Sequence, residues 1–182
     1  MEISEIILAM LHTAPGGIDG RTVIQKLGYF ISVKMGRDLG YNAGFYGPFS
    51  PLIAADLGNL VSLDFVIEKG RLTVRDRVMY SYDLADDGEK IVDKIEEQYP
   101  KELLIVKNTV KTCKKIVHNN FYVLSWAAKV HFILSQTGKG MTREEAIEAS
   151  KLFGWSLDER EVEVAVRLLL ALELIEEENR NA

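Results

Sequence analysis

Apolar positions along the chain recur mostly at helical spacing. Residues 3–13 (ISEIILAMLHT) repeat them every three or four positions, and residues 21–35 do so again. After a loop, Ser50 offers a hydroxyl for capping a helix, and Pro51 stands at a first helical position, where its missing N–H costs nothing. The pattern therefore predicts three helices in the N-terminal part of the chain, the third over residues 51–63.

Two β-rich runs follow the third expected helix and predict a hairpin. The runs flank residues 68–70 (EKG), so the turn is expected there. The return strand continues through residues 77–84 (RVMYSYDL), and a helix with acidic residues in its first turn follows it. We expect this hairpin to project from the helices as a wing.

The second half of the chain is predicted to be helical. Pro100 separates the acidic helix from a longer helical stretch over residues 101–118, and another helix is expected over residues 121–136. Two further helices begin with capping-box pairs, which are Thr142 with Glu145 and Ser156 with Glu159. Residues 121–178 thus form either a plain helical extension or a second, degenerate copy of the N-terminal pattern that ends in a strand.

The order of three helices, a hairpin and the segment YDLADDGEKI (residues 82–91) resembles that of winged helix-turn-helix proteins. More narrowly, IQKLGYFI (residues 24–31) followed by FYGPFSP (residues 45–51) resembles Panacea-domain proteins, which are antitoxin-associated, and a group of small archaeal and bacterial proteins. The resemblance implies a mainly α fold with a small β-hairpin wing. We therefore expect a winged-helix-like domain over residues 1–97 and a helical segment, or a second winged-helix-like unit, over residues 98–182.

The expected third helix carries few side chains suited to DNA. Residues 37–49 separate it from the second helix, whereas a helix-turn-helix motif has a turn of about 3–4 residues. Its polar side chains, none of them basic, are Ser50, Asp56, Asn59 and Ser62. Because the carboxylate of Asp56 would repel phosphate, the helix is interpreted more readily as a packing or protein-contact surface than as a reader of bases.

Cations gather instead on the expected wing and on the helix over residues 101–118. The residues proposed to contact a DNA backbone are Lys69, Arg71, Arg75, Arg77, Lys107 and Lys111. The wing arginines alternate, so they share one face of a strand, and phosphate binding through them would depend strongly on salt. The same pattern fits an edge strand that cations protect from aggregation, and the lysines also fit a solvated helix face or a surface for an acidic partner.

Aromatic residues crowd the loop before the third helix. Phe45, Tyr46 and Phe49 are expected to pack under the corner where the chain turns into that helix, because a loop of this length needs internal packing. Alternatively, the aromatic groups form a pocket or a protein-binding hot spot. In that interpretation, the partner-binding residues are Tyr46, Phe49, Asp56 and Asn59.

Composition narrows the functional classes. A net charge of −5 and a pI near 5.3 disfavour a protein devoted to non-specific nucleic-acid binding. The apolar runs are too short for a membrane span and the N-terminal residues lack signal-peptide features, so a cytoplasmic location is expected. Cys113 is the single cysteine and the three histidines form no metal-binding pair, so we expect no metal, no cofactor and no catalysis.

These observations predict a non-catalytic binding protein. The leading interpretation is DNA binding of the transcriptional-regulator type through the basic wing, by a homodimer that forms through the helices over residues 101–136. The alternative is a protein–protein interaction module of antitoxin or adaptor type, which would use the aromatic loop and the third helix. The two interpretations differ in the chemistry of the surface that they require, which is cationic in the first and aromatic in the second.

Overall fold

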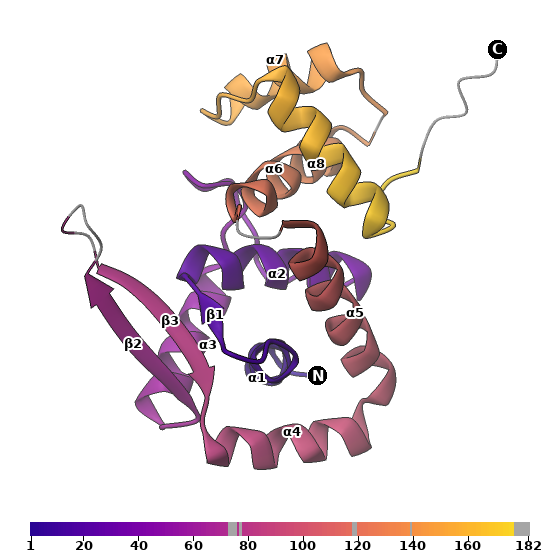
Figure 1. The fold of residues 1–182 in the computed structure, drawn as a ribbon. Coiled ribbons are helices and arrows are strands. Elements are labelled where there is room, and N and C mark those ends of the chain that lie inside the picture. The colour runs from indigo at the N-terminus through magenta and orange to yellow at the C-terminus, as the bar shows by residue number, and fades with distance from the viewer. Residues whose placement is uncertain (73–75, 77, 118–119, 139, 177–182) are drawn as a thin grey trace. The chain divides into compact units, whose positions relative to one another are not determined.

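A computed structural model of the chain describes residues 1–72, 76, 78–117, 120–138 and 140–176. Within these residues the chain forms eight α-helices and one three-stranded antiparallel sheet, which confirms the predicted mainly helical fold with a small β element (Figure 1). The chain divides into two compact units. The first unit comprises Met1–Asn42 and Phe49–Lys111, and the second comprises Ala43–Pro48 and Thr112–Ala182.

The elements follow the predicted order closely. The first unit contains α1 (Ile3–Thr13), β1 (Ile18–Asp19), α2 (Arg21–Lys34), α3 (Pro51–Ser62), β2 (Val66–Leu72), β3 (Val78–Leu84) and α4 (Asp86–Gln98). Helix α5 (Pro100–Val117) begins in the first unit and ends in the second. The second unit also contains α6 (Tyr122–Thr137), α7 (Arg143–Leu152) and α8 (Glu159–Ala171).

The division into units differs from the boundary expected after residue 97. The first unit continues through α4 and along α5 as far as Lys111. Residues 43–48, from the middle of the long loop, belong to the second unit although they lie far from it in the sequence. A single boundary along the chain therefore does not describe how these residues pack.

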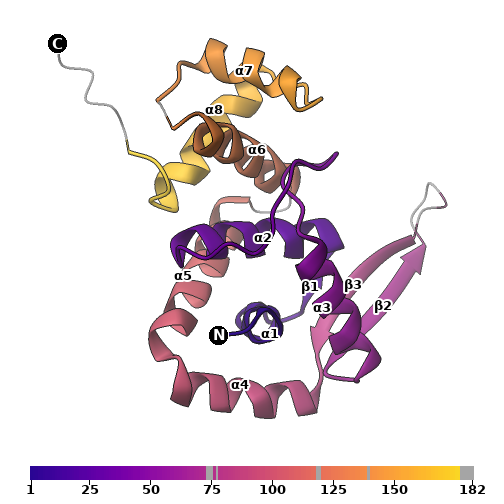
Figure 2. The same cartoon turned by 180° about the vertical axis from the view of Figure 1, so that it is seen from behind.

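Helix α1 forms the centre of the first unit. Both views show it end-on, with α2, α3 and α4 around it (Figure 1, Figure 2). Its residues from Ile6 to Leu11 are all buried, so this middle part of the helix is covered on every side. This explains why the six consecutive residues are apolar: a helical segment without a solvent-facing side has no place for a polar stripe.

The sheet has the strand order β1–β3–β2, and both pairings are antiparallel. The expected turn at residues 68–70 is wrong, because these residues lie inside β2 and the chain reverses between Leu72 and Val78. Gly70 pairs with Tyr80, and its missing side chain leaves room for neighbours, since a Cβ there would lie 3.2 Å from Cγ1 of Val78. A glycine inside a strand can thus mark a site of close cross-strand packing rather than a turn.

The second unit contains α6, α7 and α8, and the last two begin at capping boxes. The predicted box of Thr142 and Glu145 is confirmed. The other prediction is wrong by two residues, since Asp158 and Glu161 form the second box. Starting α8 at Asp158 leaves Leu157 just before the cap, where it is buried, and aspartate caps a helix as well as serine does.

The strand expected after the last helix is absent from the described residues. Residues 172–176 form a turn and a bend after α8. Glu173 adopts a left-handed backbone with φ of 55°, and the N–H of Leu174 donates to the carbonyl of Leu169. These features end the helix with a tight reversal, a common way for helices to stop.

Candidate partner-binding surfaces

The long loop before α3 is held by a buried glutamine of α2. The side-chain amide of Gln25 donates to the carbonyl of Ser50 and accepts from its N–H, both at 2.9 Å. The hydroxyl of Ser50 donates to the carbonyl of Leu39 at 2.5 Å and accepts from the N–H of Ile53, which confirms the predicted cap. Gln25 and Ser50 are 4% and 0% exposed, so these bonds fix the start of α3 in a dry site.

A glycine allows this close approach of α2 and α3. A Cβ on Gly28 would lie 2.5 Å from Cδ1 of Ile53 and 2.8 Å from the hydroxyl oxygen of Tyr41. That hydroxyl donates to the carbonyl of Gln25 at 2.8 Å. Burial raises the pKa of the Tyr41 phenol well above its usual range, so the hydroxyl remains a donor.

Residues 43–48, which we call the aromatic tip, form a small turn within the long loop. The backbones of Gly44 and Gly47 bond to each other in both directions, at 3.0 and 3.2 Å. Phe45 and Tyr46, between them, make an edge-to-face contact with ring centroids 4.8 Å apart. The expectation that Phe45, Tyr46 and Phe49 pack under the corner is wrong, because their exposed fractions are 82%, 59% and 44%.

The aromatic tip is tied to the second unit, of which it is part, by Trp155. The indole Nε1–H of Trp155 donates to the carbonyl of Gly44 at 2.8 Å. The indole is 2% exposed and stacks on Phe153 with centroids 5.1 Å apart, while Phe132 meets it edge-on and the Lys129 ammonium lies over it. Trp155 was not among the residues predicted from the sequence, although a tryptophan that is buried in a fold usually finds a partner for its N–H.

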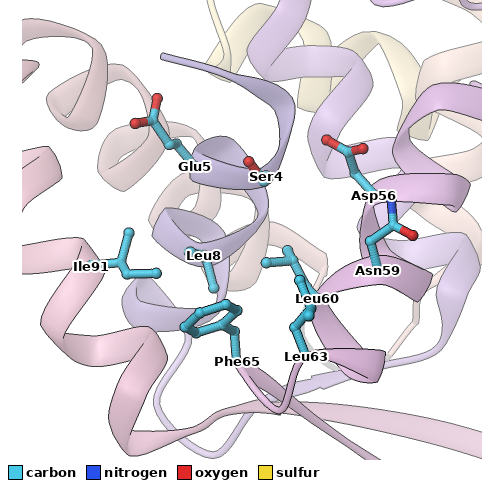
Figure 3. Close-up of a pocket in the computed structure, with 9 residues that line it drawn as sticks. All are labelled: Ser4, Glu5, Leu8, Asp56, Asn59, Leu60, Leu63, Phe65 and Ile91. Carbon is cyan, nitrogen blue, oxygen red and sulfur yellow. The ribbon is translucent and has the colours of Figure 1, made fainter.

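A groove opens on the first unit between α1, α3 and α4. It has a volume of about 440 Å³ and is lined by Ser4, Glu5, Leu8, Asp56, Asn59, Leu60, Leu63, Phe65 and Ile91. Figure 3 shows two ends of different character: the carboxylates of Glu5 and Asp56 lie at one, and apolar side chains gather at the other. Two of the predicted partner-binding residues, Asp56 and Asn59, therefore line one site.

The four predicted partner-binding residues do not form one set. Tyr46 belongs to the aromatic tip in the second unit, whereas Phe49, Asp56 and Asn59 belong to the first unit. Phe49 does not line the groove with Asp56 and Asn59. Its backbone instead pairs with Asn42 in an isolated antiparallel bridge. The aromatic tip therefore belongs to the second unit and the groove to the first.

The cations predicted on the wing differ in whether an acidic side chain pairs with them. The ammonium of Lys69 is 2.8 Å from the carboxylate of Asp83, so its charge is compensated. Arg71 is exposed on β2 opposite Met79 and makes no ion pair with any residue that the structure describes. Arg75 and Arg77 lie outside the described residues. The described part of the wing thus offers one uncompensated arginine.

The lysines predicted on α5 also differ from one another. The ammonium of Lys107 pairs with the Glu96 carboxylate at 2.9 Å, and this contact lowers the pKa of Glu96. Lys111 is exposed and makes no ion pair within the described part of the chain. An ion pair therefore compensates the charge of Lys107, whereas none among the described residues compensates that of Lys111.

A buried tyrosine joins the sheet to the start of α2. Tyr82 is 0% exposed, and its hydroxyl donates to the Glu68 carboxylate at 2.5 Å and accepts from Nε of Arg21 at 2.7 Å. Arg21 also pairs with Glu68 at 3.0 Å and lies over the ring of Tyr80. Burial, followed by the bond to Glu68, raises the pKa of Tyr82 to about 12. This cluster fixes the base of the wing.

No group of three or more metal-ligating side chains occurs among the described residues, and no helix there has the length and apolar character to cross a bilayer. Cys113 is buried in α5. Comparison of the chain with protein-family models and with curated proteins finds no match.

Proposed function

We propose that this protein is a protein–protein interaction module that binds a partner through the aromatic tip. The observation that carries the proposal is a pair of exposed rings on a hydrogen-bonded backbone. Burying a phenylalanine side chain is worth about 1.5–3 kcal/mol relative to exposing it, and the fold leaves Phe45 82% exposed. A partner that covered the ring would gain that burial.

The tip also has the features of an interface hot spot. Phenylalanine and tyrosine supply large contact areas from side chains with few rotamers, so little entropy is lost on binding. The Gly44–Gly47 bonds and the Trp155 bond hold the backbone before a partner arrives. Preorganisation of this kind reduces the cost of association.

The proposal is tested by capturing partners from a lysate of the source cells with tagged protein. We expect a defined protein to be recovered with the wild type and lost with the double variant Phe45→Ser, Tyr46→Ser. Leu152→Ser is the matched control, because Leu152 is an 85% exposed apolar residue of the same unit. Recovery of the same proteins with all three baits would contradict the proposal.

DNA binding through the wing is a second proposal, favoured by the exposed Arg71. The order α2, α3 and the β2–β3 hairpin is that of a winged helix-turn-helix, with α3 in the position of a recognition helix. This function ranks second because α3 carries no cation and Lys69 is already paired. In this proposal the protein acts as a homodimer, a state that light scattering of the purified protein measures.

A gel shift on mixed genomic DNA at low and moderate salt tests the second proposal. Binding should weaken steeply with salt and be lost when Arg71, Arg75 and Arg77 are changed to alanine. A charge-matched control replaces three exposed lysines, which are Lys90, Lys94 and Lys101. Absence of a shift at low salt, or an equal loss in the control, would exclude the wing as a DNA-binding element.

A further inference from the structure

We propose that the groove between α1, α3 and α4 binds a basic amphipathic helix of a partner protein. The apolar side chains of that helix would occupy the apolar end of the groove, and a lysine or arginine would reach the carboxylates of Glu5 and Asp56. The proposal does not depend on the aromatic tip, which belongs to the other unit.

The apolar end of the groove leaves hydrophobic surface in contact with solvent. Leu63, just past the last residue of α3, is 64% exposed, while Phe65 and Ile91 are half-buried. Leu8 and Leu60 are buried and complete the floor. A helix that inserts apolar residues spaced three or four positions apart would cover such a surface, as in known helix-in-groove complexes.

The polar end selects a cation. Glu5 and Asp56 supply two carboxylates, and none of the groove residues is basic. One oxygen of Glu5 accepts from the N–H of Glu2 at 2.5 Å, which orients the carboxylate and leaves its second oxygen for another donor. Asp56 makes no ion pair with any described residue. The complementary ligand is therefore an apolar segment that carries lysine or arginine.

Other charged residues of the chain also favour a ligand that carries lysine or arginine. Glu89 of α4 is held by His12 of α1 at 2.7 Å, and Lys90, which is next to Ile91 in the sequence, is held by Asp87 at 2.6 Å. The whole chain carries a net charge of −5, which favours the approach of a basic partner over that of an acidic one. An acidic helix would meet repulsion at the same site.

The probe is a pair of synthetic helical peptides of equal length, one made of leucine and lysine and the other of leucine and glutamate, each labelled for fluorescence anisotropy. We expect the leucine–lysine peptide to bind and its acidic twin to bind at least about tenfold more weakly. Amide NMR shifts should change on α1, α3 and α4. Equal binding of both peptides, or shifts confined to other elements, would overturn the proposal.

Variants of the groove sharpen this test. Asp56→Lys should weaken binding of the leucine–lysine peptide about tenfold, Asp56→Asn should do so to a smaller extent, and Leu63→Ser should reduce binding of the same peptide. Asp93→Lys is the control, because it makes the same charge change as Asp56→Lys at an exposed position of α4 that does not line the groove. Circular dichroism confirms that each variant is folded, and an Asp93→Lys effect as large as that of Asp56→Lys would overturn the proposal.

Discussion

Gln25 stabilises the start of α3 by binding both backbone groups of Ser50. Gln25→Ala would leave the buried N–H of Ser50 without a partner, while its carbonyl would keep only the bond from the N–H of Ala54. The free energy of unfolding should therefore fall by about 1–3 kcal/mol. Urea denaturation measures the change. Gln98→Ala is the control, since Gln98 is exposed at the end of α4 and its loss should change stability by less than about 0.5 kcal/mol. A loss for Gln25→Ala no larger than the control's would contradict this role.

The raised pKa of Tyr82 predicts that the first unit becomes less stable at alkaline pH. Its pKa is raised to about 12 by burial and by the bond to Glu68, whereas an unperturbed tyrosine has a pKa near 10. Because folding favours the protonated phenol, this stabilisation is complete below pH ~10 and is lost as the pH rises through the folded pKa. Denaturation midpoints at pH 9–12 should show a smaller alkaline decline for Tyr82→Phe than for the wild type.

The exposed Tyr46 supplies the control for this measurement. Tyr46→Phe removes a phenol from a residue that is 59% exposed, so the alkaline decline should match that of the wild type. An unchanged pH dependence in Tyr82→Phe would show that the phenol of Tyr82 does not contribute.

The structural role of a residue was predictable from the sequence where that role depends on its immediate neighbours in the chain. Ser50 and Pro51 indicated the start of α3, because the bonds that cap a helix form within about four residues. The partners of Gln25 and Trp155 were not predictable, since they lie 25 and 111 positions away in the sequence. Only the folded chain brings such groups together, and no periodic pattern encodes the pairing.

At the scale of elements, the apolar spacing predicted the helices but not their environment. The spacing over residues 3–13 predicted helix α1, but it did not indicate that all residues from Ile6 to Leu11 are buried. The hairpin turn was misplaced because Gly70 was interpreted as a turn residue, while it lies inside β2 against Tyr80. Both features depend on tertiary packing, which overrides local signals.

The aromatic tip should depend on Trp155, which lies in the loop between α7 and α8. Trp155→Phe retains an aromatic ring and removes the N–H that Gly44 accepts, so the tip should lose order without loss of the fold. Hydrogen exchange of residues 43–48 should become faster, and partner capture should weaken. Unchanged exchange in the tip would contradict the anchoring role. Phe153→Leu is the control, because it alters the same aromatic cluster but not the bond to Gly44.

Acid should weaken the second unit through α6. Burial lowers the pKa of His131 below its ordinary value near 6.5, so folding favours the neutral ring. The stabilisation is therefore complete above that ordinary pKa and is lost as the pH falls through the lower, folded value. Thermal unfolding at pH 5 and pH 7 should differ less in His131→Gln than in the wild type, and equal differences would contradict the prediction.

At the scale of the whole molecule, the chain crosses between the two units three times, at residues 42–43, 48–49 and 111–112. The sequence predicted a helical protein with a small β element, and it identified the loop aromatics as a possible binding surface. It did not predict that a fragment of that loop belongs to the second unit. Within the second unit, the bond from Trp155 to Gly44 anchors the backbone of this fragment, while Phe45 and Tyr46 are exposed.

Site-specific photocrosslinking tests whether a protein partner covers the aromatic tip. A photoreactive phenylalanine analogue would be placed at position 45 in one sample and at position 152 in another, and each protein would be irradiated in a lysate of the source cells. We expect an adduct of one defined mass from position 45 and none of that mass from position 152, although both positions are more than 80% exposed, at 82% and 85%. No adduct from position 45, or the same adducts from both positions, would contradict this expectation.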